Sequence, residues 1–212
     1  MVTTSIAVKD YLDLCERAGM FFEYVEGQVY WKNANEHPIE DELLAKLLNT
    51  DIELDTKFLG EMPTLAHRRL VSNLHGIIFP LLKKTSFEIF NQDTHIWTGI
   101  EEHYRIPDLV ITDKEQSKYL ENRFLTNPIV LIEVLSPSTQ KIDKDDKVEE
   151  YLSIENLTDY LLVSQDKVQV WHYKRNKEDS WTYKIIKNKE EKIDLESIKL
   201  KVSVKEIYEG VL

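Results

Sequence analysis

A carboxylate lies in the middle of the most apolar stretch of the sequence, Pro128–Leu135, which reads Pro-Ile-Val-Leu-Ile-Glu-Val-Leu. A run this short and rich in β-branched residues is typical of a strand that is buried on both faces. Because side chains alternate along a strand, this glutamate shares its face with Ile129, Leu131 and Leu135. An ionised carboxylate there is unfavourable unless a cation or several hydrogen-bond donors contact it. Glu133 is therefore a candidate metal ligand.

A second carboxylate, Asp108, opens the predicted strand Pro107–Ile111 and precedes Glu133 by 25 residues. If the two strands are neighbours, the carboxylates converge at one sheet edge and can hold Mg²⁺ or Mn²⁺, because such hard ions prefer oxygen ligands. The carbonyl of Val134 is a third candidate ligand. A metal held in this way lowers the pKa of a bound water and stabilises charge on a phosphate. The alternative is a Pro-Asp turn in which Asp108 is only structural.

Lys147 is a candidate third member of this centre. It lies on a helix predicted at about 142–154, in a stripe with the i, i+3, i+4, i+7 spacing of one helical face: Lys144, Lys147, Val148 and Tyr151. The apolar members turn the stripe toward the core, where an ammonium group can orient an attacking water or offset charge on a phosphate. The alternative is a surface ion pair with Asp143, which contributes only about 0.2–0.5 kcal/mol.

The first half of the sequence predicts the elements that surround these residues. In chain order we expect a helix, a hairpin of two strands, a polar segment and a second helix: 4–18, 21–25 with 28–31, 32–61, and 64–84. Gly19 suits the C-terminal end of the first helix, and Pro80 is expected to kink the second helix or end it early. The polar segment carries a short helical pattern after Asp41 and is interpreted as an inserted surface element.

The second half predicts mainly strands, at 87–97, 106–112, 128–135, 160–164, 168–173 and 181–187. Helices are expected at 113–120 and 142–154, and a closing helix at 204–208. Strands in a mixed sheet flanked by helices make an α/β or α+β domain. Since no linker divides the chain, we expect residues 1–212 to form one domain with the inserted segment at about 32–61.

Composition narrows the class of protein. The 212 residues are 42% hydrophobic and 31% charged, which is ordinary for a soluble globular protein. No apolar run approaches the roughly 18 residues needed to cross a bilayer, and Met1–Lys9 lacks the pattern of a signal peptide. A single cysteine, Cys15, excludes an internal disulfide and fits a reducing compartment, so we expect a cytoplasmic protein with no membrane partner. A net charge of −11 argues against non-specific attraction to nucleic acid, although it leaves room for a local basic channel.

In their order along the chain, these motifs resemble the PD-(D/E)XK nuclease superfamily and, within it, the Uma-type family of bacterial restriction-endonuclease-like proteins. The resemblance runs through Phe22–Gly27, Met62–Thr64 with His67, Pro107–Val110, Ile132–Thr139, Asp143 with Lys147 and Tyr151, and Asp159–Val163. Its most specific part is Glu133–Thr139, which reads Glu-Val-Leu-Ser-Pro-Ser-Thr, together with Asp143, Lys147 and Tyr151, which follow it. It covers most of the chain except the segment 32–61.

The resemblance implies a restriction-endonuclease-like mixed β-sheet flanked by helices, and metal-assisted hydrolysis of phosphodiester bonds. Asp108 and Glu133 correspond to the metal-binding carboxylates. The superfamily lysine normally stands two residues after the glutamate, where this chain has Leu135, so its role would pass to Lys147. Glu23 matches the early glutamate of the family and is a candidate catalytic residue; the alternative is an exposed strand residue.

Two functional hypotheses remain open. The first is an endonuclease that uses Mg²⁺ or Mn²⁺ to cut DNA; a double-strand cutter needs two sites, which a homodimer would supply. The second is a non-catalytic module that binds nucleic acid or protein, in which Lys147 or backbone donors meet Glu133 in place of an ion. The net negative charge, and Leu135 at the position of the superfamily lysine, favour the second hypothesis.

His67 fits the family pattern, but a histidine there is more often a capping or packing residue. A small-molecule hydrolase lacks support, because the sequence has no Gly-x-Ser-x-Gly elbow or P-loop.

Overall fold

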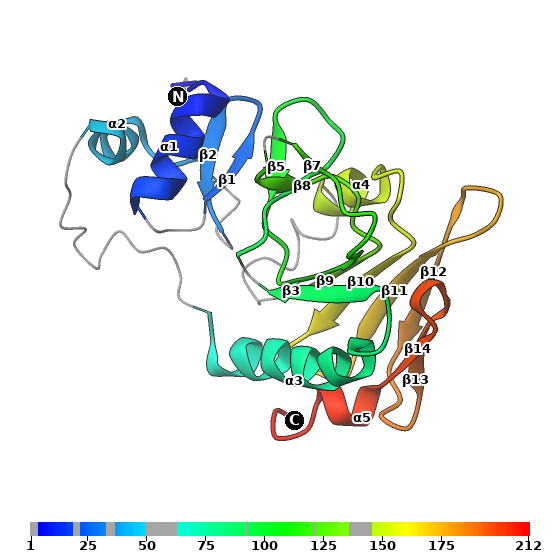
Figure 1. The fold of residues 1–212 in the computed structure, drawn as a ribbon. Helices are drawn as coiled ribbons and strands as arrows, with labels where there is room; N and C mark the ends of the chain where they lie inside the picture. The colour runs from blue at the N-terminus through cyan, green and yellow to red at the C-terminus, as the bar shows by residue number, and fades with distance from the viewer. Residues whose placement is uncertain are drawn as a thin grey trace.

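Two mixed β-sheets form the framework of the molecule, and helices cover them (Figure 1). The structure is a computed structural model, and it describes residues 4–18, 22–32, 37–49, 63–91, 93–120, 122–135 and 146–212. This mixed architecture confirms the α/β class expected from the sequence.

The central sheet contains the strands that carry the two predicted metal ligands. Its order is β12 (Trp181–Ile186), β11 (Val170–Arg175), β10 (Asp159–Ser164), β9 (Val130–Leu135), β6 (Leu109–Asp113) and β3 (Phe87–Asn91). Strands β9 and β10 are parallel, and every other neighbouring pair in this sheet is antiparallel. All six residues of β9 are buried, as its apolar sequence predicts.

The N-terminal sheet lies on one side of the central sheet, beside the first two helices (Figure 1). Its order is β2 (Gln28–Trp31), β1 (Phe22–Val25), β5 (His103–Arg105), β4 (Ile96–Trp97), β8 (Phe124–Leu125) and β7 (Tyr119–Leu120). The helices α1 (Val8–Ala18) and α2 (Asp41–Asn49) share a core with it, in which Tyr11, Leu44 and Phe22 are buried. Leu44 shows that the segment 32–61 contributes to this core through α2.

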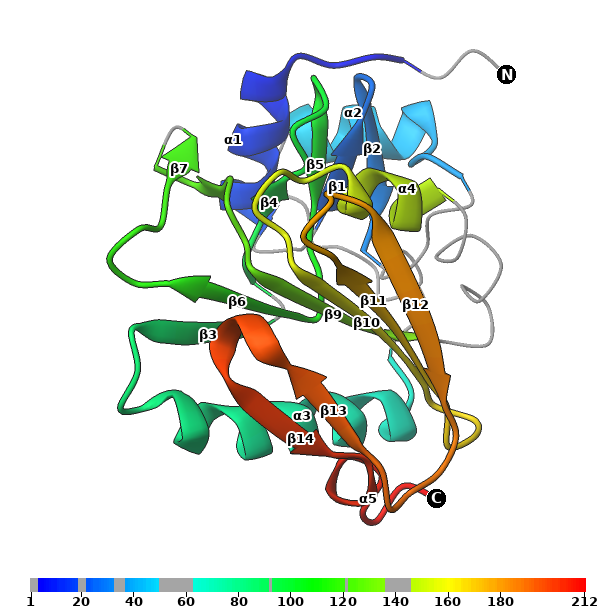
Figure 2. The same cartoon turned by 90° about the vertical axis from the view of Figure 1, so that its right-hand side faces the viewer.

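The opposite side of the central sheet is covered by α3 (Leu65–Leu82), the hairpin β13 (Lys192–Leu195) and β14 (Leu200–Ser203), and α5 (Val204–Ile207). A 3-10 turn, η2 (Glu196–Ile198), joins the two hairpin strands, and Figure 2 shows the hairpin beside α3. Alternation along β9 divides its side chains between the two cores: Ile132 faces α3, whereas Leu131 faces α4 (Asp146–Leu152).

Several expectations about the elements need correction. Residues 113–120 form a turn followed by β7, because Asp113 accepts hydrogen bonds from the Glu115 N–H and the Ser117 hydroxyl and stabilises the turn. Pro80 does not end α3 early: buried Ile78 and Leu82 hold the last turn against the core.

The boundaries of other elements also differ from the expectation. The first helix begins at Val8 rather than at residue 4, and the strand expected at 106–112 begins at Leu109. The sequence reading missed the β13–β14 hairpin, whose strands are only four residues each. Gly19 and residues 136–145, which include the start of the predicted helix 142–154, lie outside the described residues.

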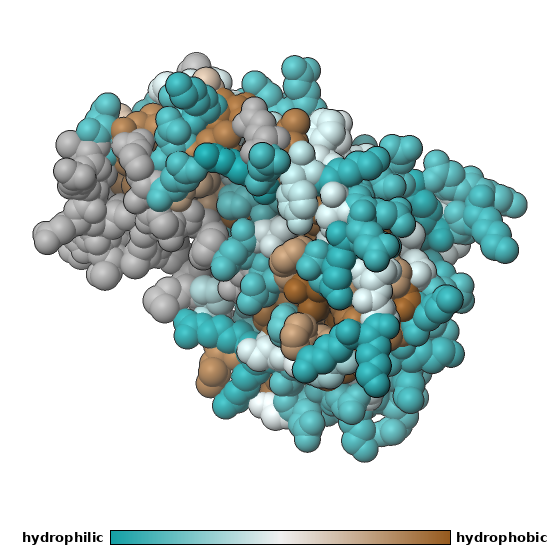
Figure 3. Space-filling view, viewed as in Figure 1, coloured by the Kyte–Doolittle hydropathy of each residue, from teal (hydrophilic) through white to brown (hydrophobic). Residues whose placement is uncertain are grey.

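The surface seen in Figure 3 is mainly hydrophilic, in keeping with the large share of charged residues. Among the described residues, no helix is both long enough and apolar enough to span a bilayer.

Candidate functional site

Asp108 and Glu133 meet at one end of the paired region of β6 and β9. The antiparallel register pairs Leu109 with Ile132, which places Asp108 beside Glu133 just beyond the last paired residues. The Asp108 N–H donates to Glu133 Oε2 at 3.2 Å, and the Val134 N–H donates to Asp108 Oδ2 at 2.8 Å. The condition that the two strands be neighbours is thus met, and both carboxylates are buried.

Two further side chains contact Asp108. His67, in the first turn of α3, brings its Nε2 to 3.1 Å from Oδ2, and Lys32, directly after β2, brings its Nζ to 3.4 Å from Oδ1. Burial by itself would raise the pKa of Asp108, but Lys32, His67 and the Val134 N–H together hold it well below its ordinary value of 3.8. Asp108 is therefore an ionised carboxylate at neutral pH.

Lys147 enters the site from α4 and contacts a third carboxylate, Glu23. Its Nζ lies 3.2 Å from Glu23 Oε1 and 4.0 Å from Glu133 Oε1. Lys147 is only 3% exposed, so the inward orientation predicted for its helical face is correct. Tyr151, one turn later, donates its hydroxyl to Glu133 Oε1 at 3.0 Å. Burial raises the pKa of Tyr151, and Glu133 and Glu23 raise it further, so the phenol stays protonated.

Glu23 is fully buried on β1, which rules out the alternative of an exposed strand residue. Besides Lys147, it accepts hydrogen bonds from Arg105 Nη1 at 3.1 Å and from the Ile106 N–H at 3.3 Å. Burial would raise the pKa of Glu23, but Lys147 and Arg105 lower it below the ordinary value of 4.5. The geometry makes Glu23 the anion shared between two buried cations.

Arg105, on β5, connects this cluster to α4. It forms a two-pronged ion pair with Glu150, with Nε–Oε2 and Nη2–Oε1 distances of 2.8 and 2.6 Å. His103 Nδ1 lies 3.4 Å from Oε1 of Glu150. Although burial opposes it, contact with Glu150 and Glu23 raises the pKa of Arg105, so its charge is permanent.

The donor set fits a hard divalent ion. Asp108 Oδ1 is buried and accepts no hydrogen bond from any described residue. In a strand, the N–H and C=O of one residue point to the same side, so the Val134 carbonyl faces the side on which its N–H meets Asp108. Within the described parts of the chain, no three His, Cys, Asp or Glu side chains form a metal-binding group. An ion here would therefore depend on two carboxylates, a carbonyl and waters, as is usual for Mg²⁺.

The buried cluster is rich in charged side chains. Among the described residues, it contains four carboxylates and three basic side chains: Glu23, Asp108, Glu133 and Glu150 with Lys32, Arg105 and Lys147. Two histidines lie beside it, His67 against Asp108 and His103 against Glu150. An ion bound by Asp108 Oδ1 would require Lys32 to move away from that oxygen.

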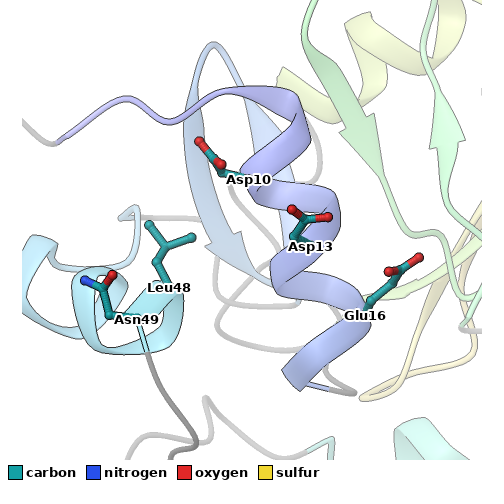
Figure 4. A pocket seen from close by; sticks show the side chains of 5 residues that line it. All are labelled: Asp10, Asp13, Glu16, Leu48 and Asn49. Atoms are coloured by element: carbon teal, nitrogen blue, oxygen red, sulfur yellow. The ribbon is translucent and has the colours of Figure 1, made fainter.

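A surface hollow of about 530 Å³ lies elsewhere, between α1 and α2 (Figure 4). It is lined by Asp10, Asp13, Glu16, Leu48 and Asn49. Three acidic side chains repel a phosphate-bearing substrate, and the hollow shares no residue with the buried cluster. It therefore offers no support for a second catalytic centre.

Comparison with known proteins settles the family. The profile of the Uma2 family, described as "Putative restriction endonuclease", matches residues 49–205 and so covers most of the chain. The chain belongs to the Uma2 family. The resemblance drawn from the motifs is confirmed, and the matched region contains Asp108, Glu133 and Lys147, whereas Glu23 precedes it.

Two relatives of this Uma2 protein come from Synechocystis and are named only as uncharacterized proteins, sll1609 and slr1290. They are 33% identical over 117 residues and 34% identical over 126 residues, which is 54% and 58% of this chain. The matches span 66% and 64% of the relatives, just under two thirds of their length.

A solved structure shares the fold of this Uma2 chain. It is the crystal structure of a "putative nuclease belonging to DUF820" from Anabaena variabilis. The two structures align with a TM-score of 0.64 over 94% of this chain and 98% of the other, at 17% sequence identity. The alignment shows that the two chains share one fold over nearly their whole length.

Sequence reasoning missed three members of the cluster: Lys32, Arg105 and Glu150. Lys32 directly follows a strand, and nothing in its neighbourhood indicates a buried partner. Arg105 stands two residues before Pro107 in a three-residue strand, too short for periodicity to be read. Glu150 lies three residues after Lys147, so the helical spacing could have placed it on a nearby face.

Proposed function

We propose that this chain is an endonuclease that hydrolyses phosphodiester bonds of DNA with the help of Mg²⁺ or Mn²⁺. The observation that carries the proposal is the pair of buried carboxylates, Asp108 and Glu133, held side by side with a lysine approaching from α4. Asp108, Glu133 and the Val134 carbonyl would hold the metal. When bound, the ion would acidify a water and stabilise negative charge on the phosphate.

The residues of the chain divide the remaining work. Lys147 would orient the attacking water and offset charge on the phosphate, because its ammonium lies 4.0 Å from Glu133. Tyr151 fixes the Glu133 carboxylate through its hydroxyl, and His67 fixes that of Asp108. Glu23 contacts Lys147 directly and would keep its ammonium in place. Since Glu23 meets two cations, its proposed role is to position Lys147 and not to hold the metal.

We also propose a cellular location, a domain organisation and an oligomeric state for this chain. A reducing cytoplasm suits the single Cys15, a chain without an evident linker suits one domain, and cutting both strands of DNA would call for a homodimer. None of these assignments affects the chemistry of the buried centre.

The second candidate function is a non-catalytic module that binds nucleic acid or protein. It is favoured by the contacts of the buried carboxylates with Lys32, Arg105 and Lys147, which already supply much of the positive charge they need. In that case the cluster only stabilises the fold, and no metal binds.

The test is a cleavage assay with linear, supercoiled and branched DNA in Mg²⁺ or Mn²⁺. Wild type is compared with Glu133→Gln and with Glu178→Gln, a matched change at an exposed carboxylate in the β11–β12 turn. We expect Glu133→Gln to abolish cleavage without loss of folding and Glu178→Gln to behave as wild type. Cleavage by Glu133→Gln at the wild-type rate would refute the assignment.

A further inference from the structure

The N-terminal end of α3 lies next to the buried carboxylate centre, because His67 in its first turn contacts Asp108. Thr64 caps the helix, and its hydroxyl oxygen accepts the His67 N–H at 3.1 Å. The N–H groups of Leu65 and Ala66, at the first two helical positions, have no acceptor within the helix. Together with the aligned peptide dipoles, they make this helix end attractive to an anion.

The side chains of this helix end add positive charge. The first turn of α3 contains no acidic residue, and Arg68 lies there with an exposed side chain. Arg69, the next residue, is also exposed and donates a hydrogen bond to the Gly210 carbonyl. Acidic residues are the favourable choice at a helix N-terminus, and arginines are unfavourable in the absence of an anion. Thr64 and Leu65 are also exposed, so a ligand can reach the helix end from solvent.

An independent observation comes from Gln165, the residue directly after β10. Its side chain is 3% exposed, and its Oε1 accepts the hydroxyl proton of Thr64. The hydroxyl oxygen of Thr64 also accepts the His67 N–H, and the glutamine amide is oriented with its Oε1 toward this hydroxyl. Its Nε2 therefore lies beside the helix cap, and it finds no acceptor among the residues that the structure describes. A buried donor without an acceptor is unfavourable, so a ligand oxygen would stabilise it.

We propose that the first turn of α3 and Gln165 form a subsite for a phosphate group of a nucleic-acid backbone. The N–H groups of Leu65 and Ala66 and the Gln165 amide donate to non-bridging phosphate oxygens, and Arg68 adds charge. The subsite holds a phosphate next to the one that is cut, so it contributes to substrate binding and not to bond cleavage. It deepens the proposed function and rests on it for the identity of the ligand; free phosphate has the same chemistry.

The first test is a nitrogen-15 NMR titration of the wild-type protein without metal, first with inorganic phosphate and then with a short DNA duplex. We expect saturable shifts of the Leu65 and Ala66 amides and of the Gln165 side-chain amide with both ligands, and tighter binding of the duplex. Shifts with inorganic phosphate alone would assign the subsite to free phosphate and overturn the nucleic-acid assignment. No shift at these groups with either ligand would overturn the subsite itself.

The second test measures binding of a fluorescent duplex by anisotropy, again without metal. We expect Gln165→Glu, which places a carboxylate against the phosphate, to weaken binding about 10-fold or more, and Gln165→Leu to weaken it about 3-fold. Gln116→Glu, the same change at an exposed turn residue, should alter affinity less than about 2-fold. Arg68→Gln should reduce the slope of log affinity against log salt by about 0.9. Equal affinities for Gln165→Glu and Gln116→Glu would contradict the proposal.

These measurements need no catalysis, so the two proposals can fail separately. Absence of cleavage by the wild type would contradict the nuclease assignment even if the duplex binds through Gln165. Conversely, metal-dependent cleavage with an unchanged KM in Gln165→Glu would contradict the subsite and leave the nuclease assignment intact.

Discussion

At the scale of single residues, each buried carboxylate is held by a different set of donors. Asp108 meets Lys32, His67 and a backbone N–H, whereas Glu23 meets Lys147 and Arg105. Such contacts favour the charged forms of the carboxylates. The negative charge expected to attract a metal is therefore built into the folded protein and is present at neutral pH.

Glu23 makes the stability of the protein depend on pH. Its pKa in the folded state lies below the ordinary value of 4.5, so its contribution is fully present above pH 4.5 and is lost as the pH falls toward the lowered value. We expect the free energy of unfolding, measured with urea from pH 7 to pH 2, to decrease below pH 4.5. Glu23→Gln should be less stable at pH 7 and show a shallower decrease. Parallel curves for the two proteins would contradict this explanation.

Lys147 allows a test of chemistry at one residue. Lys147→Met removes the ammonium near Glu133, and we expect it to lower kcat about 10²-fold or more with little change in KM. In this variant Glu23 still pairs with Arg105, so we expect the protein to remain folded. Lys177, which is exposed in the turn between β11 and β12, is a matched lysine outside the site, and Lys177→Met serves as the control. A Lys147→Met enzyme with wild-type kcat would exclude the assigned role.

At the scale of elements, α3 shows how tertiary packing overrides local propensity. Its 18 residues include Gly76 and Pro80, both unfavourable in a helix, yet buried Leu74, Ile78 and Leu82 keep the helix intact to its end. The helix is therefore more stable in its context than its sequence suggests.

Gly76 offers a direct check of this explanation. A Cβ at Gly76 would meet no atom within 4 Å, so Gly76→Ala should stabilise the protein by about 1 kcal/mol and raise Tm by about 2–4 °C. Gly27→Ala is the contrasting change, because its φ is +81° and the new Cβ would collide with Ser5 Oγ. We expect Gly27→Ala to lower Tm in the same thermal unfolding experiment. A lower Tm for Gly76→Ala would show that the glycine is needed for packing.

Sequence reasoning predicted the elements that depend on local pattern. The apolar runs around Glu133 and after Asp108 were enough to predict two strands, whereas their adjacency could only be stated as a condition, which the structure meets. Lys32 and Arg105 could not be found in this way, because their burial depends on how the N-terminal sheet packs beside the central sheet. Contacts between residues as distant as Arg105 and Glu23 leave no periodic trace in one sequence.

At the scale of the whole molecule, Arg105 joins elements from different layers: β5 and β1 of the N-terminal sheet and α4, which packs on the central sheet. Breaking a buried ion pair leaves a charge uncompensated, so Arg105→Met should cost about 3–5 kcal/mol of unfolding free energy. Replacing both partners removes that penalty. We expect the double variant Arg105→Met, Glu150→Met to be more stable than Arg105→Met alone in urea unfolding. If the double variant loses as much unfolding free energy as the two single variants together, Arg105 and Glu150 are not coupled and the explanation is refuted.

The central claim is that Asp108 and Glu133 form a metal centre, and calorimetric titration with Mn²⁺ tests it most directly. We expect one Mn²⁺ to bind per chain in the wild type, binding to weaken at least 10-fold in Asp108→Asn and in Glu133→Gln, and Glu178→Gln to bind as the wild type does. No binding by the wild type, or equal binding by all four proteins, would contradict the claim and favour the non-catalytic module.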